Sequence, residues 1–143
     1  MSLIKLVSIK LKIVILIIGL IIVSVGEAYG MDWKFYWFDE NFLAYYDAQS
    51  ITRPSKNIVR MWVKLNYNEK GVMDVVGKLG KKYENFSHVI VLYEINCIEK
   101  MIRAKESIDY DNKGRVIHSS RSPLEWNFII PGSMGEILYE IFK

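Results

Sequence analysis

The stretch from Ile58 to Tyr67 alternates between two sets of side chains, and this period of two constrains the fold more than any other feature of the sequence. Successive side chains of a β-strand point to opposite faces of a sheet. One face of this strand therefore carries Met61, Val63, Leu65 and Tyr67, and the other carries Arg60, Trp62, Lys64 and Asn66. A strand with one apolar and one polar face is typical of an antiparallel sheet that covers a core on one side only.

Further strands lie before and after this one along the chain. Aromatic residues, which favour strands, dominate the two segments that flank Asp39 to Asn41. The tetrapeptide Asp111-Asn112-Lys113-Gly114 predicts a tight hairpin turn, because Asp and Asn accept local backbone hydrogen bonds and Gly114 can adopt a positive φ. The expected strands are residues 33–38, 42–47, 58–67, 87–96, 101–110 and 115–119. Strands that follow one another so closely predict an antiparallel meander of about six strands.

The remaining segments predict turns and helices. Residues 53–57 contain Pro54 and indicate a turn, and residues 124–130 indicate an extended connection or edge strand. Residues 69–82 predict a short, frayed helix, since apolar residues recur at helical spacing among three glycines. Ser133 and Glu136 match a capping box that begins a C-terminal helix. The apolar side of that helix is Met134, Ile137, Leu138, Ile141 and Phe142. A helix this short must dock on one face of the sheet to be stable, so the expected fold class is α+β.

Residues 1–30 have the three parts of a secretory signal peptide: a basic start, an apolar stretch from Ile13 to Val25 and small residues at a cleavage site. Ala28 and Gly30 predict cleavage before Met31, and a competing site follows Ala28. The alternative is an uncleaved membrane anchor, for which the apolar stretch is short. No cysteine lies near the end of the leader, which excludes a bacterial lipid anchor. We therefore expect a leader of residues 1–30 and a single domain of residues 31–143.

Charge and composition give no sign of a chemical reaction or of nucleic-acid binding. The formal net charge of the chain is +3, and most of it belongs to the leader, so the domain is nearly neutral. One cysteine and two histidines, His88 and His118, are too few and too scattered for a zinc site or a nucleophile with its base. We therefore expect no catalytic residues, no cofactor and no metal site.

The density of aromatic residues is the one feature that indicates a partner. Tyr and Trp are enriched at protein interfaces, although a small sheet could also bury such residues under its own helices. The candidate partner-binding residues are Trp33, Tyr36, Trp37, Tyr45, Tyr46 and Trp62. The lone Cys97 cannot form an internal disulfide, so we expect it to be buried, or else to pair with another chain.

Several phrases of the sequence resemble the surface-adhesin protein E family, and they follow one another in the same order over nearly the whole domain. They are Asp32-Trp33-Lys34, Tyr45-Tyr46-Asp47, Ser50 to Lys64, Tyr93 to Cys97 and Ile130 to Glu136. The resemblance implies an antiparallel sheet of about six strands with a C-terminal helix on its concave face. It also implies kinship with an outer-membrane adhesin that binds host extracellular-matrix proteins.

The chain departs from that family in two respects. Relatives often tie the helix to the sheet through a disulfide, for which Cys97 matches the strand partner, but the C-terminal helix here contains no cysteine. The lipid-attachment cysteine of a lipoprotein leader is also missing.

These observations together predict a non-enzymatic, exported protein of the periplasm or cell surface that binds an extracellular or envelope protein. Nucleic acid is not an expected partner, and the membrane is expected to be contacted only through the leader. Two alternatives stay open: a periplasmic structural or assembly module that acts as a homodimer through a sheet edge, and an inner-membrane protein anchored by an uncleaved leader.

Overall fold

The structure is a computed structural model that describes residues 2, 3, 5 and 31–143. The predicted leader therefore lies almost entirely outside the described residues, and its cleavage stays a prediction. Residues 31–143 form one unit with its own hydrophobic core. Within the described residues, no helix combines the length and the apolar character needed to cross a membrane.

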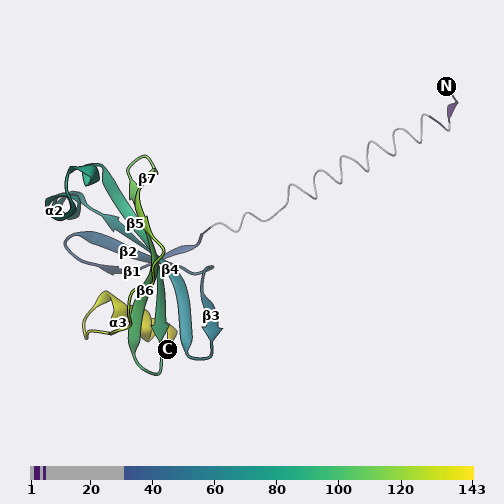
Figure 1. Cartoon of the computed structure of the whole chain (residues 1–143). Helices are drawn as coiled ribbons and strands as arrows, with labels where there is room; N and C mark the ends of the chain where they lie inside the picture. The colour runs from purple at the N-terminus through teal and green to yellow at the C-terminus, as the bar shows by residue number, and fades with distance from the viewer. Residues whose placement is uncertain (1, 4, 6–30) are drawn as a thin grey trace. The chain divides into compact units, whose positions relative to one another are not determined.

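Six strands form an antiparallel meander in the order β1-β2-β4-β5-β6-β7, as the sequence predicts (Figure 1). Each strand pairs with its neighbour along this path, and β4 and β5 lie in the middle of the sheet. The strands of the path are β1 (Trp33–Phe38), β2 (Phe42–Asp47), β4 (Ile58–Tyr67), β5 (Phe86–Asn96), β6 (Met101–Asp111) and β7 (Val116–Ser120).

Two short strands lie off this path, and each pairs with one of its strands. β3 (Thr52–Ser55) pairs with the first residues of β4, and β8 (Asn127–Phe128) pairs with the first residues of β6. The prediction of a turn over residues 53–57 is wrong for its first half, because Pro54 lies within β3. Proline has no N–H to donate, and an edge strand is the place in a sheet where this loss is tolerated.

The two helices begin at side-chain caps. α2 (Glu69–Leu79) begins where the Asn68 side chain accepts a hydrogen bond from the Gly71 N–H at 2.9 Å, and a 3-10 turn (η1, Lys81–Tyr83) follows it. α3 (Met134–Phe142) begins where Ser133 Oγ accepts from the Glu136 N–H at 3.3 Å. The Glu136 carboxylate completes this cap by accepting from the Gly132 N–H at 2.6 Å. The predicted capping box is confirmed, except that the Glu136 carboxylate accepts from the N–H of Gly132, one residue before the N-cap residue Ser133.

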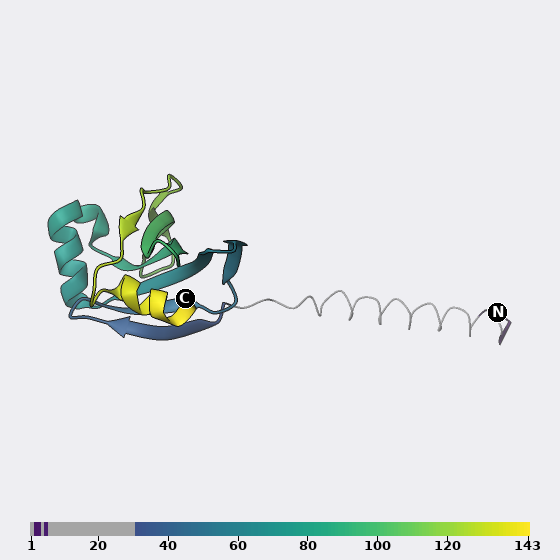
Figure 2. The same ribbon diagram turned by 90° about the horizontal axis from the view of Figure 1, so that it is seen from below.

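Both helices lie on the same side of the sheet (Figures 1 and 2), so the sheet has a helix-covered face and an open face. Met61 and Val63 of β4 are fully buried on the helix-covered face, and Leu138 of α3 is fully buried against them in the same core. Ile141 was expected to join this apolar contact, but it is 43% exposed. The docked C-terminal helix and the α+β fold class are confirmed.

Candidate functional site

A β-bulge in β1 divides the aromatic residues of the chain between the two faces of the sheet. The register of β1 on β2 shifts between Phe35 and Trp37, which leaves Tyr36 as the extra residue. Tyr36 and Trp37 both pack against the core on the helix-covered face, whereas Phe35 and Phe38 are exposed. Alternation alone would have placed Tyr36 and Trp37 on opposite faces.

The open face carries an aromatic patch, which we define as Trp33, Phe35, Phe38, Leu43 and Tyr45. Phe35 is 54% exposed, Phe38 67% and Leu43 44%. The Phe35 ring lies 5.7 Å from that of Tyr45 in an edge-to-face arrangement and 6.5 Å from that of Phe38. Phe35, Phe38 and Leu43 are the most exposed members of the patch, and sequence analysis missed them. Their exposure depends on the bulge in β1 and on the register of β1 with β2, which the sequence does not reveal.

Lys64 connects this patch to the centre of the sheet. Its Nζ lies 4.7 Å from the ring centroid of Trp33 and 5.7 Å from that of Tyr45, which are cation–π distances. Lys64 and Trp62 project from the same face of β4, since they are two residues apart. Trp62 is half-buried there. Three of the six predicted partner-binding residues, Trp33, Tyr45 and Trp62, therefore share the open face.

A cationic cluster, which we define as Arg60, Arg103 and Lys105, lies next to Trp62 around the carboxylate of Glu94. Arg60 Nε and Nη2 donate to one oxygen of Glu94 at 3.2 and 2.9 Å. Arg103 Nε and Nη2 donate to the other at 3.0 and 2.8 Å, and Lys105 Nζ lies 3.8 Å from it. Burial alone would raise the pKa of Glu94, but these hydrogen bonds and the charge of Lys105 outweigh burial and lower it. The Glu94 carboxylate is therefore ionised at neutral pH, although its side chain is only 4% exposed.

Strand pairing creates this cluster from distant parts of the sequence. Arg60, Glu94 and Arg103 are direct cross-strand partners on β4, β5 and β6. A second bulge, in β6 opposite Leu92 and Tyr93, inserts Lys105 beside them. The guanidinium of Arg103 also lies 4.5 Å from the ring centroid of Trp126. Sequence analysis identified Arg60 only as a neighbour of Trp62, and it missed Arg103, Lys105 and Trp126.

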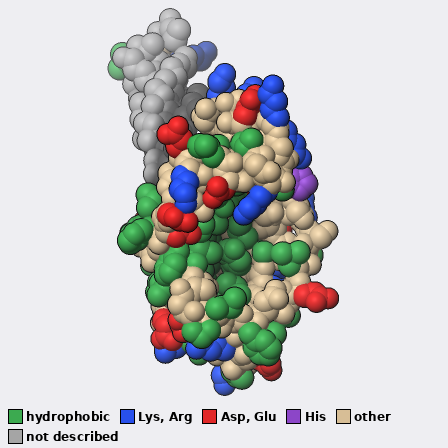
Figure 3. Space-filling model, turned by 90° about the vertical axis from the view of Figure 1, so that its left-hand side faces the viewer, with side chains coloured by type: hydrophobic (Ala, Val, Ile, Leu, Met, Phe, Trp, Pro, Cys, Tyr) green, Lys and Arg blue, Asp and Glu red, His purple; other side chains and the backbone are tan. Residues whose placement is uncertain are grey.

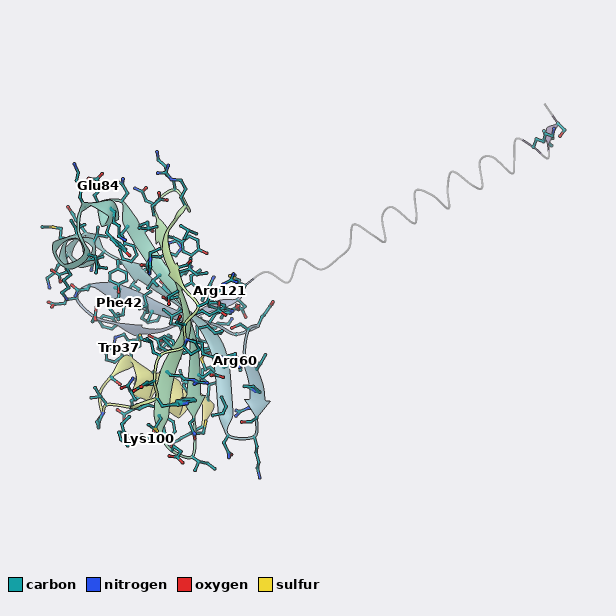
Figure 4. All side chains as sticks on the ribbon, viewed as in Figure 1. Trp37, Phe42, Arg60, Glu84, Lys100 and Arg121 are labelled. Atoms are coloured by element: carbon teal, nitrogen blue, oxygen red, sulfur yellow. The ribbon has the colours of Figure 1, made fainter. Side chains whose placement is uncertain are left out.

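The other three predicted residues, Tyr36, Trp37 and Tyr46, lie on the helix-covered face and are not brought together with the first three. Tyr46 packs edge-to-face on Phe142 of α3 at 5.1 Å. Burial raises the pKa of Tyr36, whose hydroxyl is enclosed without a hydrogen-bond partner among residues 31–143. Figure 3 shows hydrophobic side chains gathered on this side of the molecule, and Figure 4 places Trp37 and Phe42 between the two helices. These residues hold the domain together.

The comparison with protein families matches residues 33–142 to surface-adhesin protein E. The chain belongs to the surface-adhesin protein E family. The matched range runs from the first residue of β1 to the last of α3, so the family domain here is the sheet with its C-terminal helix. The comparisons with curated proteins and with solved structures found no match.

This member of the family holds its helix without a disulfide in the described part of the chain. Cys97 follows β5 as a free thiol that is half-buried, so the predicted burial is only partial. Its pairing with another chain, the alternative that the sequence left open, stays a prediction. Apolar contacts of Leu138 and Phe142 dock α3, and Arg53 Nη2 donates to the Phe142 carbonyl at 3.1 Å. Apolar burial therefore replaces the covalent link that the family resemblance implied.

His88 and Asp111 make contacts that are structural. The His88 ring stacks on Tyr110 at 4.9 Å, and Asp111 closes its hairpin by accepting from the N–H groups of Lys113 and Arg115. Residues 31–143 contain no group of three or more potential metal ligands. A cavity of about 180 Å³ lies beside β6 and is lined by Ala104, Lys105, Glu106, Ser107, Ser120, Ser122 and Leu124.

Proposed function

We propose that this chain is an exported, non-enzymatic protein of the cell envelope or cell surface that binds another protein through the open face of its sheet. The observation that carries the proposal is the aromatic patch. Phe35, Phe38 and Leu43 lie together on a face that neither helix covers, and each is more than 40% exposed. Adjacent apolar residues that stay in contact with water are typical of an interaction surface.

The open face supports this proposal better than the helix-covered face does. Tyr36, Trp37 and Tyr46 already pack against the core, so a partner would have to displace contacts that stabilise the domain. The patch residues, by contrast, can be covered by a partner without any rearrangement of the sheet. Burying their apolar surface would contribute roughly 25 cal/mol for each Å² removed from water, before the costs of association.

The proposed location follows from the leader and from the family. A cleaved signal peptide would deliver residues 31–143 to the periplasm, and passage to the cell surface would bring the patch to host proteins. The family resemblance implies kinship with an outer-membrane adhesin that binds host extracellular-matrix proteins, so such proteins are the first partners to test. The alternative of an uncleaved, membrane-anchored leader would place the same open face at the outer side of the inner membrane.

The rival proposal is a homodimer formed through the edge strand β1. β1 is the first strand of the sheet path, with a partner on one side only, and it contains no proline and only one lysine, Lys34. Natural proteins usually protect such an edge with proline, charges, a covering segment or a bulge. Of proline, charges and a bulge, β1 has only Lys34 and the bulge between Phe35 and Trp37. Sedimentation of the protein at increasing concentration tests this rival, which predicts a dimer that disappears when Phe35 is replaced by proline.

Replacement of the two most exposed patch residues tests the proposal. The protein is produced from the full-length chain and applied to immobilised laminin, fibronectin and collagen. We expect the double variant Phe35→Ser/Phe38→Ser to lose at least tenfold in affinity for any matrix protein that the wild type binds. Met73→Ser is the matched control, since Met73 is 68% exposed on α2, away from the open face. Unchanged binding by the double variant would contradict the proposal.

A further inference from the structure

The cationic cluster holds three positive charges around a single carboxylate. Arg60 and Arg103 each satisfy one oxygen of Glu94, and Lys105 is the third cation within 4 Å. Neutralisation of Glu94 requires only one of them, so the cluster keeps an excess of two positive charges. The two arginines satisfy both oxygens of the buried carboxylate, as its burial requires, and the net charge of the cluster is nevertheless +2.

The two arginines keep donors that their contact with Glu94 does not use. Each engages Glu94 through Nε and Nη2, and Nη1 of each has no acceptor among residues 31–143. The side chains of Arg60, Arg103 and Lys105 are 32%, 28% and 26% exposed, so water and other molecules can reach them. A guanidinium whose one edge is fixed by a carboxylate can present its other donors in a defined plane.

Trp126 helps to hold the guanidinium of Arg103 in a fixed plane. Its ring lies 4.5 Å from the Arg103 guanidinium carbon, a distance typical of cation–π stacking. Glu94 and Trp126 thus contact Arg103 from two directions and restrict its rotamers before any ligand binds. A positioned donor of this kind binds an anion at a smaller entropic cost than a free surface arginine does.

The other ionisable groups on this face do not cancel the excess charge. Glu106 of β6 adds one negative charge opposite Leu92, and Lys64 of β4 adds one positive charge. Burial and the nearby charge of Lys64 lower the pKa of His88, which is therefore neutral at neutral pH. The open face of β4, β5 and β6 keeps two more positive than negative charges.

We propose that the cationic cluster binds a carboxylate from an acidic segment of a partner protein, whose neighbouring apolar side chains contact the aromatic patch. This inference rests on the proposed function and specifies the chemistry of the partner. Trp62 and Lys64 connect the two surfaces along one face of β4, and Lys64 itself contacts Trp33 and Tyr45. Arg60 lies on the same face of β4 as Trp62 and opposite the buried Met61, whereas Trp37 and Phe42 pack against the core.

A protein segment fits this surface better than a polyanion does. Phe35, Phe38 and Leu43 need apolar counterparts, which an acidic peptide with leucine or phenylalanine beside its carboxylates can supply. An excess of two charges matches one or two carboxylates, whereas sulfated glycans and nucleic acids carry charge along their whole length. An acidic partner with apolar neighbours is therefore the occupant to which we commit.

A labelled peptide tests the inference directly. The probe is a fluorescein-labelled peptide of six glutamates followed by two leucines, and its partner probe carries glutamine in place of each glutamate. We expect fluorescence anisotropy to show saturable binding of the glutamate probe to the protein produced from the full-length chain. We expect the glutamine probe to bind at least fivefold more weakly, and a rise in NaCl from about 50 to about 300 mM to weaken binding of the glutamate probe.

Three variants separate a binding role of the cluster from a structural one. Lys105→Gln should weaken binding about threefold and Lys105→Glu should abolish it, while Glu94 keeps both arginines. Arg103→Gln removes the guanidinium that Glu94 and Trp126 position and should weaken binding at least fivefold, provided that circular dichroism shows a folded protein. Lys78→Gln, an equal charge change on the exposed face of α2, is the control and should leave binding within twofold.

The inference is overturned if both probes bind equally, if Lys105→Glu binds like the wild type, or if heparin binds while the glutamate probe does not. If the wild type does not bind the glutamate probe but binds a matrix protein through Phe35 and Phe38, the acidic partner is refuted. The proposed function is then still supported. Loss of the matrix interaction as well would refute both.

Discussion

Glu94 and Arg103 are direct partners on neighbouring strands, and two hydrogen bonds of 3.0 and 2.8 Å join one carboxylate oxygen to the guanidinium. Arg60 repeats the arrangement on the other oxygen from the strand on the opposite side. One buried carboxylate therefore links three consecutive strands, β4, β5 and β6, on the face that has no helix. It stabilises the sheet and positions the two arginines.

Glu94→Gln is expected to lower the free energy of unfolding by about 1 to 3 kcal/mol, because two arginines lose their ionic acceptor and an amide nitrogen faces them instead. The loss should stay below that of a fully buried pair, since both arginines are about one-third exposed. Urea denaturation measures the change. Glu99→Gln, at an exposed turn position, is the control and should stay within about 0.5 kcal/mol of the wild type.

The free energy of unfolding should also depend on pH through the titration of Glu94. The pKa of Glu94 is lowered in the folded state from its ordinary value of 4.5, so its contribution is present above that value and is lost as pH falls through the folded pKa. We expect the wild type to lose stability between about pH 5 and about pH 3 more steeply than Glu94→Gln does. Urea denaturation at several pH values gives the two slopes, and parallel slopes would show that Glu94 does not titrate as described.

Gly71 and Gly77 lie on the same helix and should respond oppositely to alanine. A Cβ at Gly71 would clash with the carbonyl oxygen of Asn41 and lie 2.8 Å from the Tyr67 ring, whereas a Cβ at Gly77 would meet nothing within 4 Å. Gly77→Ala should therefore raise the free energy of unfolding by about 0.5 to 1 kcal/mol through helix propensity. Gly71→Ala should lower it by more than 1 kcal/mol, as a rough estimate for overpacking. Thermal denaturation of both variants checks the difference in sign.

Leu138 should carry most of the docking energy of α3. Its side chain is fully buried, while Ile141 on the same helix is 43% exposed. We expect Leu138→Ala to cost about 2 to 5 kcal/mol and Ile141→Ala to cost less than about 1 kcal/mol. Amide hydrogen exchange of α3 tests whether the helix itself loosens, because a helix of nine residues is not stable without its tertiary contacts. Equal effects of the two substitutions would mean that α3 is held in another way.

The meander and its C-terminal helix could be predicted from sequence because each rests on local signals. The alternation of Ile58 to Tyr67 gave the two faces of β4, and the Asp111 to Gly114 turn gave the β6–β7 hairpin. The prediction of a turn at Pro54 is wrong, because a proline in an edge strand has the same local sequence signal as a proline in a loop. Only the pairing with β4 distinguishes the two.

The candidate site could be predicted only in part, because it depends on the register between strands. The bulge at Tyr36 moves Trp37 to the covered face, and nothing in the run from Trp33 to Phe38 signals a bulge. Glu94 and Arg103 meet because their strands pair in one particular register, which a single sequence does not specify. The aromatic density of the sequence pointed to the correct hairpin, but the exposed members of the patch emerged only from the structure.

Site-specific photo-crosslinking tests the central claim, that the open face is the binding surface, most directly. A photoreactive phenylalanine analogue replaces Phe38 on the open face or, in a second variant, Met73 on α2; both positions are well exposed. Each variant, produced from the full-length chain, is illuminated with a matrix protein that the wild type binds. The account predicts a covalent adduct from position 38 and none from position 73. An adduct from position 73 alone would contradict it.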